Sequence, residues 1–272
     1  MAITAAQVKE LRDKTGAGMM DCKKALSEAN GDFEQAIDIL RKKGQKVAAK
    51  RGENEAKEGV IFAESKGNVG YMLQLNCETD FVAKNDDFRN FVTSILNVAI
   101  ENGASSVEEL NGLKYNDKLT VAEKITEHVG VIGEKLDLSN YAKVEAAEVV
   151  AYNHPGNQLA ALVALNKEGQ SEAGKQVAMQ VAAMNPLALN KDGIDADTIA
   201  RELEVGKDLA IQEGKPAEMA EKIAQGRLGK FFKENTLLSQ ASIKDNKQTV
   251  EQYLQSMDKD LTVTEFKRFS LS

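Results

Sequence analysis

Residues 69–85, with the sequence VGYMLQLNCETDFVAKN, carry the pattern from which the rest of the fold can be worked out. Apolar side chains recur at every second position from Val69 to Leu75, which is the period of a strand with one buried face. The alternation stops at Asn76, and a largely polar stretch follows at positions 77–80. The sequence therefore predicts a half-buried strand that ends in a polar turn.

An apolar pair, Phe81-Val82, stands directly after this turn and is followed by the largely polar residues 84–87. Polar neighbours on both sides make it difficult to bury the pair completely. Two interpretations of Phe81 remain open. It packs the following helix onto the sheet, since most phenylalanine side chains lie in cores, or it projects together with Asp80 into a pocket of another molecule.

The composition is that of a globular protein. The chain has 272 residues, of which 42% are hydrophobic and 28% charged, and this length is sufficient for two or more units with their own cores. No apolar stretch approaches the ~20 residues that span a bilayer. The first residues also lack the basic and apolar regions of a secretion signal. We therefore expect a cytoplasmic protein without a membrane segment.

Charge and cysteine content narrow the choice of partner and compartment. The net charge of −7 argues against a general nucleic-acid binder, whose phosphate contacts require a basic face. The same net charge is compatible with binding to a protein partner. The two cysteines, Cys22 and Cys77, are far apart in the sequence, so free thiols in a reducing compartment fit better than a disulfide.

Residues 1–55 have the pattern of a small domain of three helices. Thr4 and Gln7 have the spacing of a capping box at the start of the first helix. A second helix is predicted over residues 19–29. Asp32 caps a third helix, whose apolar stripe has the spacing i, i+3, i+4, i+7 and consists of Phe33, Ala36, Ile37 and Leu40.

A basic stretch follows at residues 41–51, where six of the eleven residues are lysine or arginine. Basic residues near the C-terminus of a helix interact favourably with the helix dipole. A solvated helix end and linker therefore explains the stretch better than a contact to RNA or to an acidic partner. Residues 52–59 then mark a domain boundary.

The chain beyond this boundary contains an internal duplication. The strand–turn–strand pattern at residues 60–75 recurs at 149–165, and each copy is followed by an amphipathic helix, at 86–101 and 171–184. The sequence predicts an α+β core of two similar halves, each with a small antiparallel sheet and covering helices. The first half is residues 56–145, and the second is made of residues 146–185 and 229–272.

An insertion separates the two parts of the second half. The copies are offset by 89 positions at Val60 and Val149 but by 129 positions at Val121 and Val250, so about 40 residues are inserted. The inserted residues 186–228 have no strand pattern and predict a helical hairpin, with Pro216 at a favoured first-turn position. One interpretation is that this hairpin packs back onto the core.

Two long strings of this sequence resemble a known family. Residues 75–83, LNCETDFVA, resemble the signature of elongation factor Ts, and residues 11–26, LRDKTGAGMMDCKKAL, resemble a second signature of the same family. The family comprises guanine-nucleotide exchange factors of the GTPase elongation factor Tu. The resemblance also implies a ubiquitin-associated-type fold for the three-helix domain and an antiparallel coiled-coil arm for the inserted hairpin. Such arms mediate dimer contacts in some members of the family, so the resemblance offers a homodimer through residues 186–228 as a second interpretation of the hairpin.

The resemblance further implies roles for particular residues. A wedge that displaces Mg²⁺ from elongation factor Tu, so that GDP leaves and GTP reloads the site, is assigned to Thr79, Asp80, Phe81 and Val82. Docking of the partner is assigned to the N-terminal signature, at Leu11, Arg12, Gly16, Gly18, Met19 and Met20. A further partner contact is assigned to His154 in the second hairpin.

Two features depart from the family pattern. Gln74 occupies a position that is usually glutamate, and the hairpin at residues 155–160 lacks the second glycine, the basic residue and the third glycine that the family leads us to expect.

Nothing in the sequence indicates covalent catalysis. The only histidines, His128 and His154, are not spaced as a pair, and no P-loop, nucleophile elbow, CxxC or HExxH motif occurs. Cys77 has no identifiable histidine partner that would activate it. No cluster of metal ligands is evident. We therefore expect no enzyme, no cofactor and no metal, and no direct contact with nucleic acid.

Two other functions remain possible. A non-exchange binding or chaperone module of the translation apparatus would use residues 1–55 for docking and the core as a scaffold. An RNA-binding translation factor would use residues 41–51. Release of labelled GDP from the partner distinguishes an exchange factor from the first alternative, and a steep salt dependence of RNA affinity identifies the second.

Overall fold

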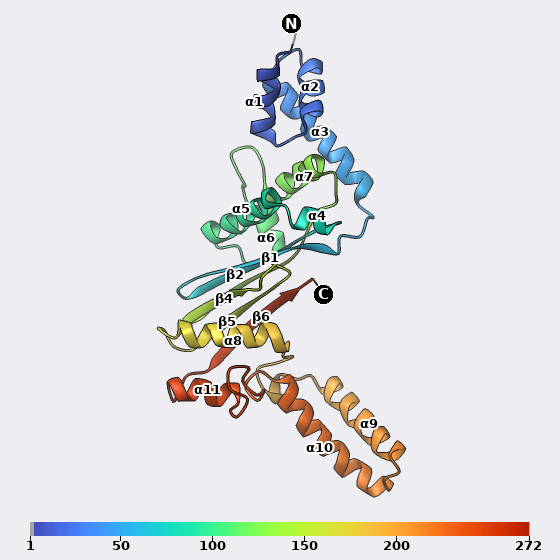
Figure 1. Ribbon diagram of the computed structural model, residues 1–272, viewed down its shortest axis with the longest axis vertical. Coiled ribbons are helices and arrows are strands. Elements are labelled where there is room, and N and C mark those ends of the chain that lie inside the picture. Colours follow the sequence, from blue (N-terminus) through green and yellow to red (C-terminus); the bar gives the residue numbers. More distant parts are fainter. Residues whose placement is uncertain (1–2, 272) are drawn as a thin grey trace.

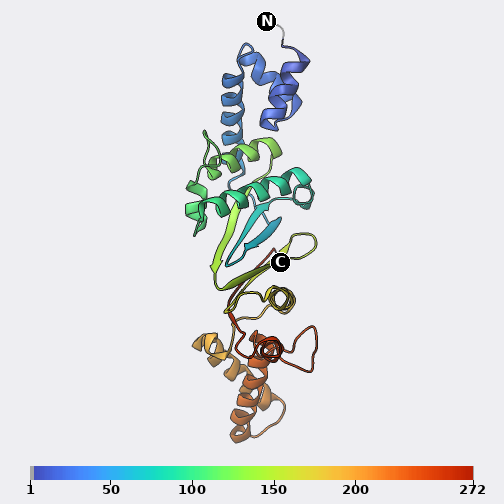
Figure 2. The same cartoon turned by 90° about the vertical axis from the view of Figure 1, so that its left-hand side faces the viewer.

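The computed structural model describes residues 3–271 and arranges them along one long axis (Figure 1). A unit of three helices lies at one end, two small sheets with their covering helices occupy the middle, and a helical hairpin projects at the other end. The view turned by 90° shows the same elongated order (Figure 2). None of the helices in the described part of the chain is long and apolar enough to cross a membrane.

The N-terminal unit consists of three helices, α1 (Ala5–Thr15), α2 (Met19–Glu28) and α3 (Phe33–Arg51). The predicted capping box is present, with the Thr4 and Gln7 side chains bonding to each other's backbone N–H groups, and Asp32 caps α3 by accepting from the Gln35 N–H at 3.0 Å. The small core of this unit contains Val8, Leu11, Ala17, Cys22, Ala25, Leu26, Ala29 and Ala36.

Helix α3 is longer than the sequence predicts, and this corrects the assignment of residues 41–51 as a helix end and linker. The helix continues to Arg51 and crosses α7 (Val121–Ile132) of the core. At the crossing the two backbones approach so closely that a Cβ on Gly130 would lie 2.4 Å from the Gly44 Cα. Val47 and Ala48 pack against the core of the first half. The second part of α3 therefore belongs to the core.

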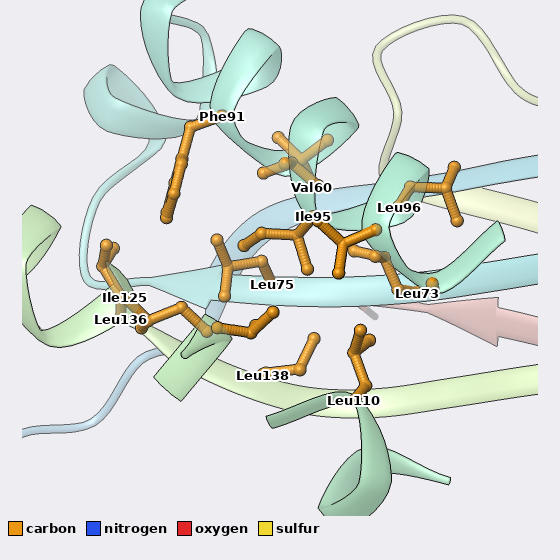
Figure 3. Close-up of a cluster of buried hydrophobic side chains, with 14 of the residues drawn as sticks. Val60, Leu73, Leu75, Phe91, Ile95, Leu96, Leu110, Ile125, Leu136 and Leu138 are labelled. Atoms are coloured by element: carbon orange, nitrogen blue, oxygen red, sulfur yellow. The ribbon is translucent and has the colours of Figure 1, made fainter. Parts of the chain in front are cut away.

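The first half of the core contains an antiparallel sheet of order β1–β2–β3, formed by β1 (Glu58–Lys66), β2 (Val69–Cys77) and β3 (Asp137–Glu145). Its helices are α4 (Asp80–Ala83), α5 (Asp86–Asn102), α6 (Val107–Gly112) and α7. Side chains from one face of β2 meet those of α5 in a dry cluster (Figure 3). Leu73 and Leu75 of β2 and Ile95 of α5 lie at its centre and are completely buried.

The second half repeats this arrangement and confirms the predicted duplication. Its sheet has the order β4–β5–β6 and is formed by β4 (Glu148–Asn153), β5 (Leu159–Leu165) and β6 (Val263–Ser270), with helices α8 (Ser171–Met184) and α11 (Val250–Met257). Even local irregularities recur. The register shifts after Gln74 in the first sheet and after Ala164 in the second, and α7 and α11 both begin with a capping box.

The two sheets pack face to face, and this corrects the prediction of a half-buried strand at residues 69–75. Strand β2 is buried on both faces, because its second face, through Met72, meets the apolar face of the other sheet. Gly70 lies where a Cβ would come within 2.5 Å of Val149, so a glycine is needed for the sheets to approach. The buried amides of Gln74 and Asn76 bond to each other at 3.0 Å.

The insertion forms the predicted hairpin, which projects from the core (Figure 1). A short 3₁₀ helix (Lys191–Gly193) precedes α9 (Ala196–Gln212) and α10 (Ala217–Asn235). The two helices approach closely, because a Cβ added to Gly206 of α9 would lie 3.3 Å from the Cα of Ala224 in α10. Helix α10 continues without a break past residue 228, so the insertion and the second half share one helix. Phe231 and Phe232 are half-buried on this helix.

Candidate functional site

The chain makes a single helical turn, α4, directly after β2 ends at Cys77. We call residues 79–83 the tip. Thr79 caps the turn by accepting from the Val82 N–H at 3.5 Å. The turn directs Val82 and Ala83 toward the core of the first half. It leaves the Phe81 side chain pointing outward.

Phe81 is 83% exposed, the highest value among the large hydrophobic side chains that the structure describes. The packing role considered for Phe81 falls instead to its neighbours, since Val82 packs against the core cluster and Ala83 is buried within it. An aromatic ring held in water in this way matches the second interpretation, in which the ring is available to another molecule.

Asp80 lies beside the exposed ring and is paired with Lys84, whose Nζ donates to the carboxylate at 2.6 Å. The hydrogen bond from Lys84 and the charge of that residue hold the pKa of Asp80 below its ordinary value, so the carboxylate is ionised at neutral pH. Because the pair is exposed, it is weak. The carboxylate can therefore exchange Lys84 for another cationic partner.

The tip is fixed from beneath by Glu134, which follows α7. The Glu134 carboxylate accepts from the Glu78 N–H at 3.1 Å, from the Thr79 N–H at 3.0 Å and from the Thr79 hydroxyl at 2.7 Å. Gly133 ends α7 with a φ of 80°, a conformation that favours glycine and that turns the chain so that Glu134 reaches the tip.

The Glu78 side chain in turn holds two other segments, the end of α3 and the residues after α7. Arg51, the last residue of α3, donates from Nη1 to both Glu78 carboxylate oxygens at 2.9 and 2.8 Å. Asn54 donates at 3.0 Å, and the Lys135 N–H donates to the same carboxylate. Burial raises the pKa of Glu78, but these hydrogen bonds and the Arg51 charge outweigh it and leave the pKa below its ordinary value.

Sequence reasoning did not identify Arg51, Asn54, Glu134 or Lys135 as part of the site. These residues lie on two segments far from the signature in the sequence and are brought to it only by the packing of α3 on α7. Charged residues after helix ends are common, so no local pattern distinguishes these four.

Cys77 is completely buried at the base of the tip, and its thiol donates to the Thr79 carbonyl oxygen at 3.2 Å. Burial, together with the nearby Glu134 carboxylate, raises the pKa of Cys77 to about 12. Because the thiolate is the nucleophilic form, this cysteine is unreactive at neutral pH. Both cysteines are free and buried.

The N-terminal signature is divided between core and surface. Leu11 is completely buried among the three helices, so its assignment as a direct partner contact is corrected: its side chain supports the fold of the three-helix unit. The other assigned residues, Arg12, Gly16, Gly18, Met19 and Met20, are exposed. Met19 and Met20 are 45% and 65% exposed, and they place apolar side chains at the start of α2.

His154 lies in the exposed turn between β4 and β5, where its Nδ1 is 3.0 Å from the Tyr152 hydroxyl. The turn is tied to the edge of β1, since Asn157 accepts from the Ile61 N–H at 2.7 Å and Asn153 accepts from the Ala63 N–H at 2.8 Å. His154 is therefore held on the core but is free to meet a partner.

No group of three or more potential metal-ligating side chains occurs among residues 3–271. The exposed features of this chain are thus a braced aromatic tip, an apolar pair of methionines and a hairpin arm. Such features suit contact with a macromolecule.

Comparisons with known proteins agree with this geometry. The family model described as elongation factor TS matches residues 78–272. Elongation factor Ts of Christiangramia forsetii is 51% identical over 273 residues, covering 99% of this chain and 98% of the relative. The chain belongs to the elongation factor Ts family. Elongation factor Ts of Flavobacterium psychrophilum is 50% identical over 99% of this chain and 98% of the relative, and that of Porphyromonas gingivalis is 46% identical over 100% and 99%.

Membership of the elongation factor Ts family confirms the resemblance found in the two signatures. It makes the chain a translation elongation factor. The established role of the family is guanine-nucleotide exchange on elongation factor Tu, a role that requires no covalent chemistry.

Proposed function

We propose that this chain promotes GDP release from elongation factor Tu by inserting Phe81 into a pocket between helices of the GTPase. The observation that carries the proposal is the 83% exposure of Phe81 on a turn fixed by hydrogen bonds. An exposed aromatic side chain on a rigid support loses little conformational entropy when it binds, which is the character of an interface anchor.

Asp80 supplies the electrostatic part of the mechanism. In GTPases of this kind the nucleotide is held by backbone N–H groups, a lysine and Mg²⁺. Entry of Phe81 carries the ionised Asp80 toward the groups that organise the metal and its waters. Loss of Mg²⁺ leaves the phosphate charges of GDP under-compensated, so GDP leaves faster and GTP can reload the site.

The partner must also be held while the tip acts. We assign this docking to the exposed face formed by Arg12, Gly16, Gly18, Met19 and Met20, and a second contact to His154. A factor that binds the nucleotide-free GTPase more tightly than the loaded one accelerates release, and by reciprocity bound nucleotide weakens the factor. The complex should therefore dissociate when GDP and Mg²⁺ are added together.

We extend the proposal to the architecture of the chain and to its setting in the cell. The three-helix unit would be ubiquitin-associated-like, and the hairpin of α9 and α10 would act as a coiled-coil arm that can pair two copies into a homodimer. The factor would work in the cytoplasm without a cofactor of its own, without covalent chemistry and without direct contact to nucleic acid. The net charge of −7 supports the last point.

Release of a fluorescent GDP analogue from elongation factor Tu, measured in stopped flow, tests the proposal. We predict that Phe81→Ala lowers the exchange rate at least roughly tenfold, because truncation of an aromatic anchor often costs about 2 kcal/mol or more. The fold should be unaffected, since the ring touches little of its own chain. Normal exchange by Phe81→Ala would exclude Phe81 as the wedge.

A passive binding or chaperone module makes a different prediction in the same measurement. Such a module forms a complex with elongation factor Tu but leaves the GDP release rate at its basal value, whatever residue occupies position 81. Phe232→Ala is a matched control, because Phe232 is half-buried on α10, away from the tip. It should exchange at the wild-type rate.

A further inference from the structure

Three segments of the chain are tied together directly beneath the tip. They are the end of α3, the end of β2 and the residues after α7, which are joined by a set of side chains that we call the brace: Arg51, Asn54, Glu78, Thr79, Glu134 and Lys135. Each of the three segments both gives and receives hydrogen bonds in this set. The brace lies outside the residues that the two family signatures assign to partner contact, apart from Thr79.

The tip needs such support because α4 contains only four residues, Asp80–Ala83. An isolated helix of this length does not form in water, since the first turn fixes several residues for a single hydrogen bond. Backbone bonds that tie this turn to its flanking residues include those from the Ala83 and Lys84 N–H groups to the Thr79 and Asp80 carbonyl oxygens, at 3.3 and 3.0 Å. The conformation of the tip is therefore set by what holds its first residues.

Two glutamates hold these first residues reciprocally. Glu134 accepts both backbone N–H groups of Glu78 and Thr79 as well as the Thr79 hydroxyl, while Glu78 accepts the N–H of Lys135, next to Glu134. Both side chains are half-buried. Hydrogen bonds to a charged acceptor in such a site are stronger than neutral ones, so this pair fixes the direction in which Phe81 points.

The brace also connects the tip to the docking unit. Arg51 is the last residue of α3, and the same helix begins in the three-helix unit that carries Met19 and Met20. Lys135 reinforces the joint, because its Nζ donates to the carbonyl oxygens of Gly52 and Asn54 at 2.8 and 3.0 Å. Together with the close crossing at Gly44 and Gly130, the joint fixes the docking surface and the tip relative to each other.

We infer that Glu134 and the Arg51–Glu78 pair are positioning residues for nucleotide exchange, which hold the tip in the conformation that enters the partner once the docking unit has bound. The inference rests on the proposed function of Phe81. It makes a specific kinetic statement: loss of the brace impairs the step after docking, while docking itself continues.

The variant that tests the inference is Glu134→Ala, which removes all three hydrogen bonds that hold Glu78 and Thr79 at the start of the tip. If the tip is then in the competent conformation about a tenth of the time, the maximal rate of GDP release falls about tenfold. The concentration of factor that gives half of the maximal rate should change less than about threefold, because Met19 and Met20 are untouched. Both quantities come from titrating the variant against elongation factor Tu that carries a fluorescent GDP analogue.

Two further variants separate positioning from general stability. Glu134→Gln keeps the shape and one acceptor oxygen, so it should recover most of the maximal rate. Lys57→Ala is the matched control, because Lys57 pairs only with Glu55, in an exposed ion pair on the linker just beyond the brace, and it should behave as wild type. All rates are measured at a temperature where circular dichroism shows every variant to be folded.

Hydrogen exchange gives a readout that a merely structural role would not produce. In Glu134→Ala the amides of Ala83 and Lys84 should lose protection, while those of β2 keep theirs. A double-mutant cycle of Arg51→Ala and Glu78→Gln should be non-additive in the maximal rate. A wild-type maximal rate in folded Glu134→Ala, or unchanged protection of the two tip amides, overturns the inference.

Phe81→Ala is measured in the same series to keep the two proposals apart. If Phe81→Ala exchanges normally, the proposed function of the tip fails. If Phe81→Ala is impaired and Glu134→Ala is not, the tip stands and only the brace is rejected. If both fall with unchanged half-saturation, both proposals are supported.

Discussion

Phe81 and Phe88 lie close together in the sequence, but Phe81 is 83% exposed and Phe88 only 2% exposed. Burial of a phenylalanine side chain stabilises a fold by about 1.5–3 kcal/mol, and the chain forgoes this gain at Phe81. Val82 and Ala83 supply the packing of the turn, so Phe81 is not needed for the fold. Its exposure therefore supports the proposal that Phe81 contacts the partner.

His128 is the second residue whose surroundings have a measurable consequence. Its ring stacks on Phe91 with the centroids 3.7 Å apart, and its buried Nδ1 has no hydrogen-bond partner in the described part of the chain. Burial, with a smaller effect of the Lys124 charge, lowers the pKa of His128 from 6.5 to about 4. The folded protein thus holds this imidazole neutral.

The burial of His128 predicts that the folded protein loses stability in mild acid. Between pH 6.5 and 4 the unfolded chain binds a proton at His128 that the folded chain excludes. Protonation of the unfolded chain therefore costs no stability above pH 6.5, and the free energy of unfolding declines as the pH falls from 6.5 toward 4. His128→Phe should remove up to about 2 kcal/mol of the stability lost between pH 7 and pH 5. Urea unfolding at both pH values measures this difference.

The control for His128 is the other histidine. His154 lies in an exposed turn, and His154→Ala is measured beside His128→Phe to show that the effect belongs to the buried ring. Equal losses of stability in the wild type and in His128→Phe would contradict the account of this residue.

At the scale of elements, the sequence predicted the strands, the duplication and the hairpin, because each rests on a local period or a repeated spacing. It did not predict that β2 is buried on both faces. The side chains of its second face include Gly70 and Gln74, which read as polar or small and are covered only when the second sheet packs on them.

The assignment of residues 41–51 as a linker was wrong for a related reason. Basic residues dominate the stretch, yet Gly44, Val47 and Ala48 have helical spacing i, i+3, i+4 and form a narrow stripe. The stripe packs on α7 while the lysines remain in water. The position of Arg51 beneath the tip depends on this packing and could not be deduced from the sequence without it.

The crossing of α3 and α7 provides a test at this scale. Gly130→Ala places a Cβ 2.4 Å from the Gly44 Cα, so the helices must separate. We predict a destabilisation of about 1–3 kcal/mol, as for other overpacked sites, measured by urea unfolding. Gly226→Ala in α10 is the matched control, because an added Cβ there meets nothing within 4 Å. It should be neutral or stabilising by up to about 1 kcal/mol. Equal effects of the two substitutions would contradict the close crossing.

The whole molecule is an extended body that offers separate surfaces along its length (Figure 1). The three-helix unit, the tip and the hairpin arm are carried by one continuous core, so a large partner can be contacted at several places at once. Because the second part of α3 packs on α7, removal of residues 1–52 would also uncover the core. Docking and exchange are better separated by point substitutions at the surface.

The central claim, that the tip enters elongation factor Tu, can be tested by thiol labelling. Cys22 and Cys77 are both buried and both have a raised pKa, so Phe81→Cys introduces a uniquely reactive thiol. Met257→Cys is the control, at an exposed position on α11. We predict that saturating nucleotide-free elongation factor Tu slows labelling at position 81 at least about tenfold, an order expected for burial in a partner pocket, and leaves position 257 unaffected. Labelling at position 81 at the same rate in the free chain and in the saturated complex would contradict the claim.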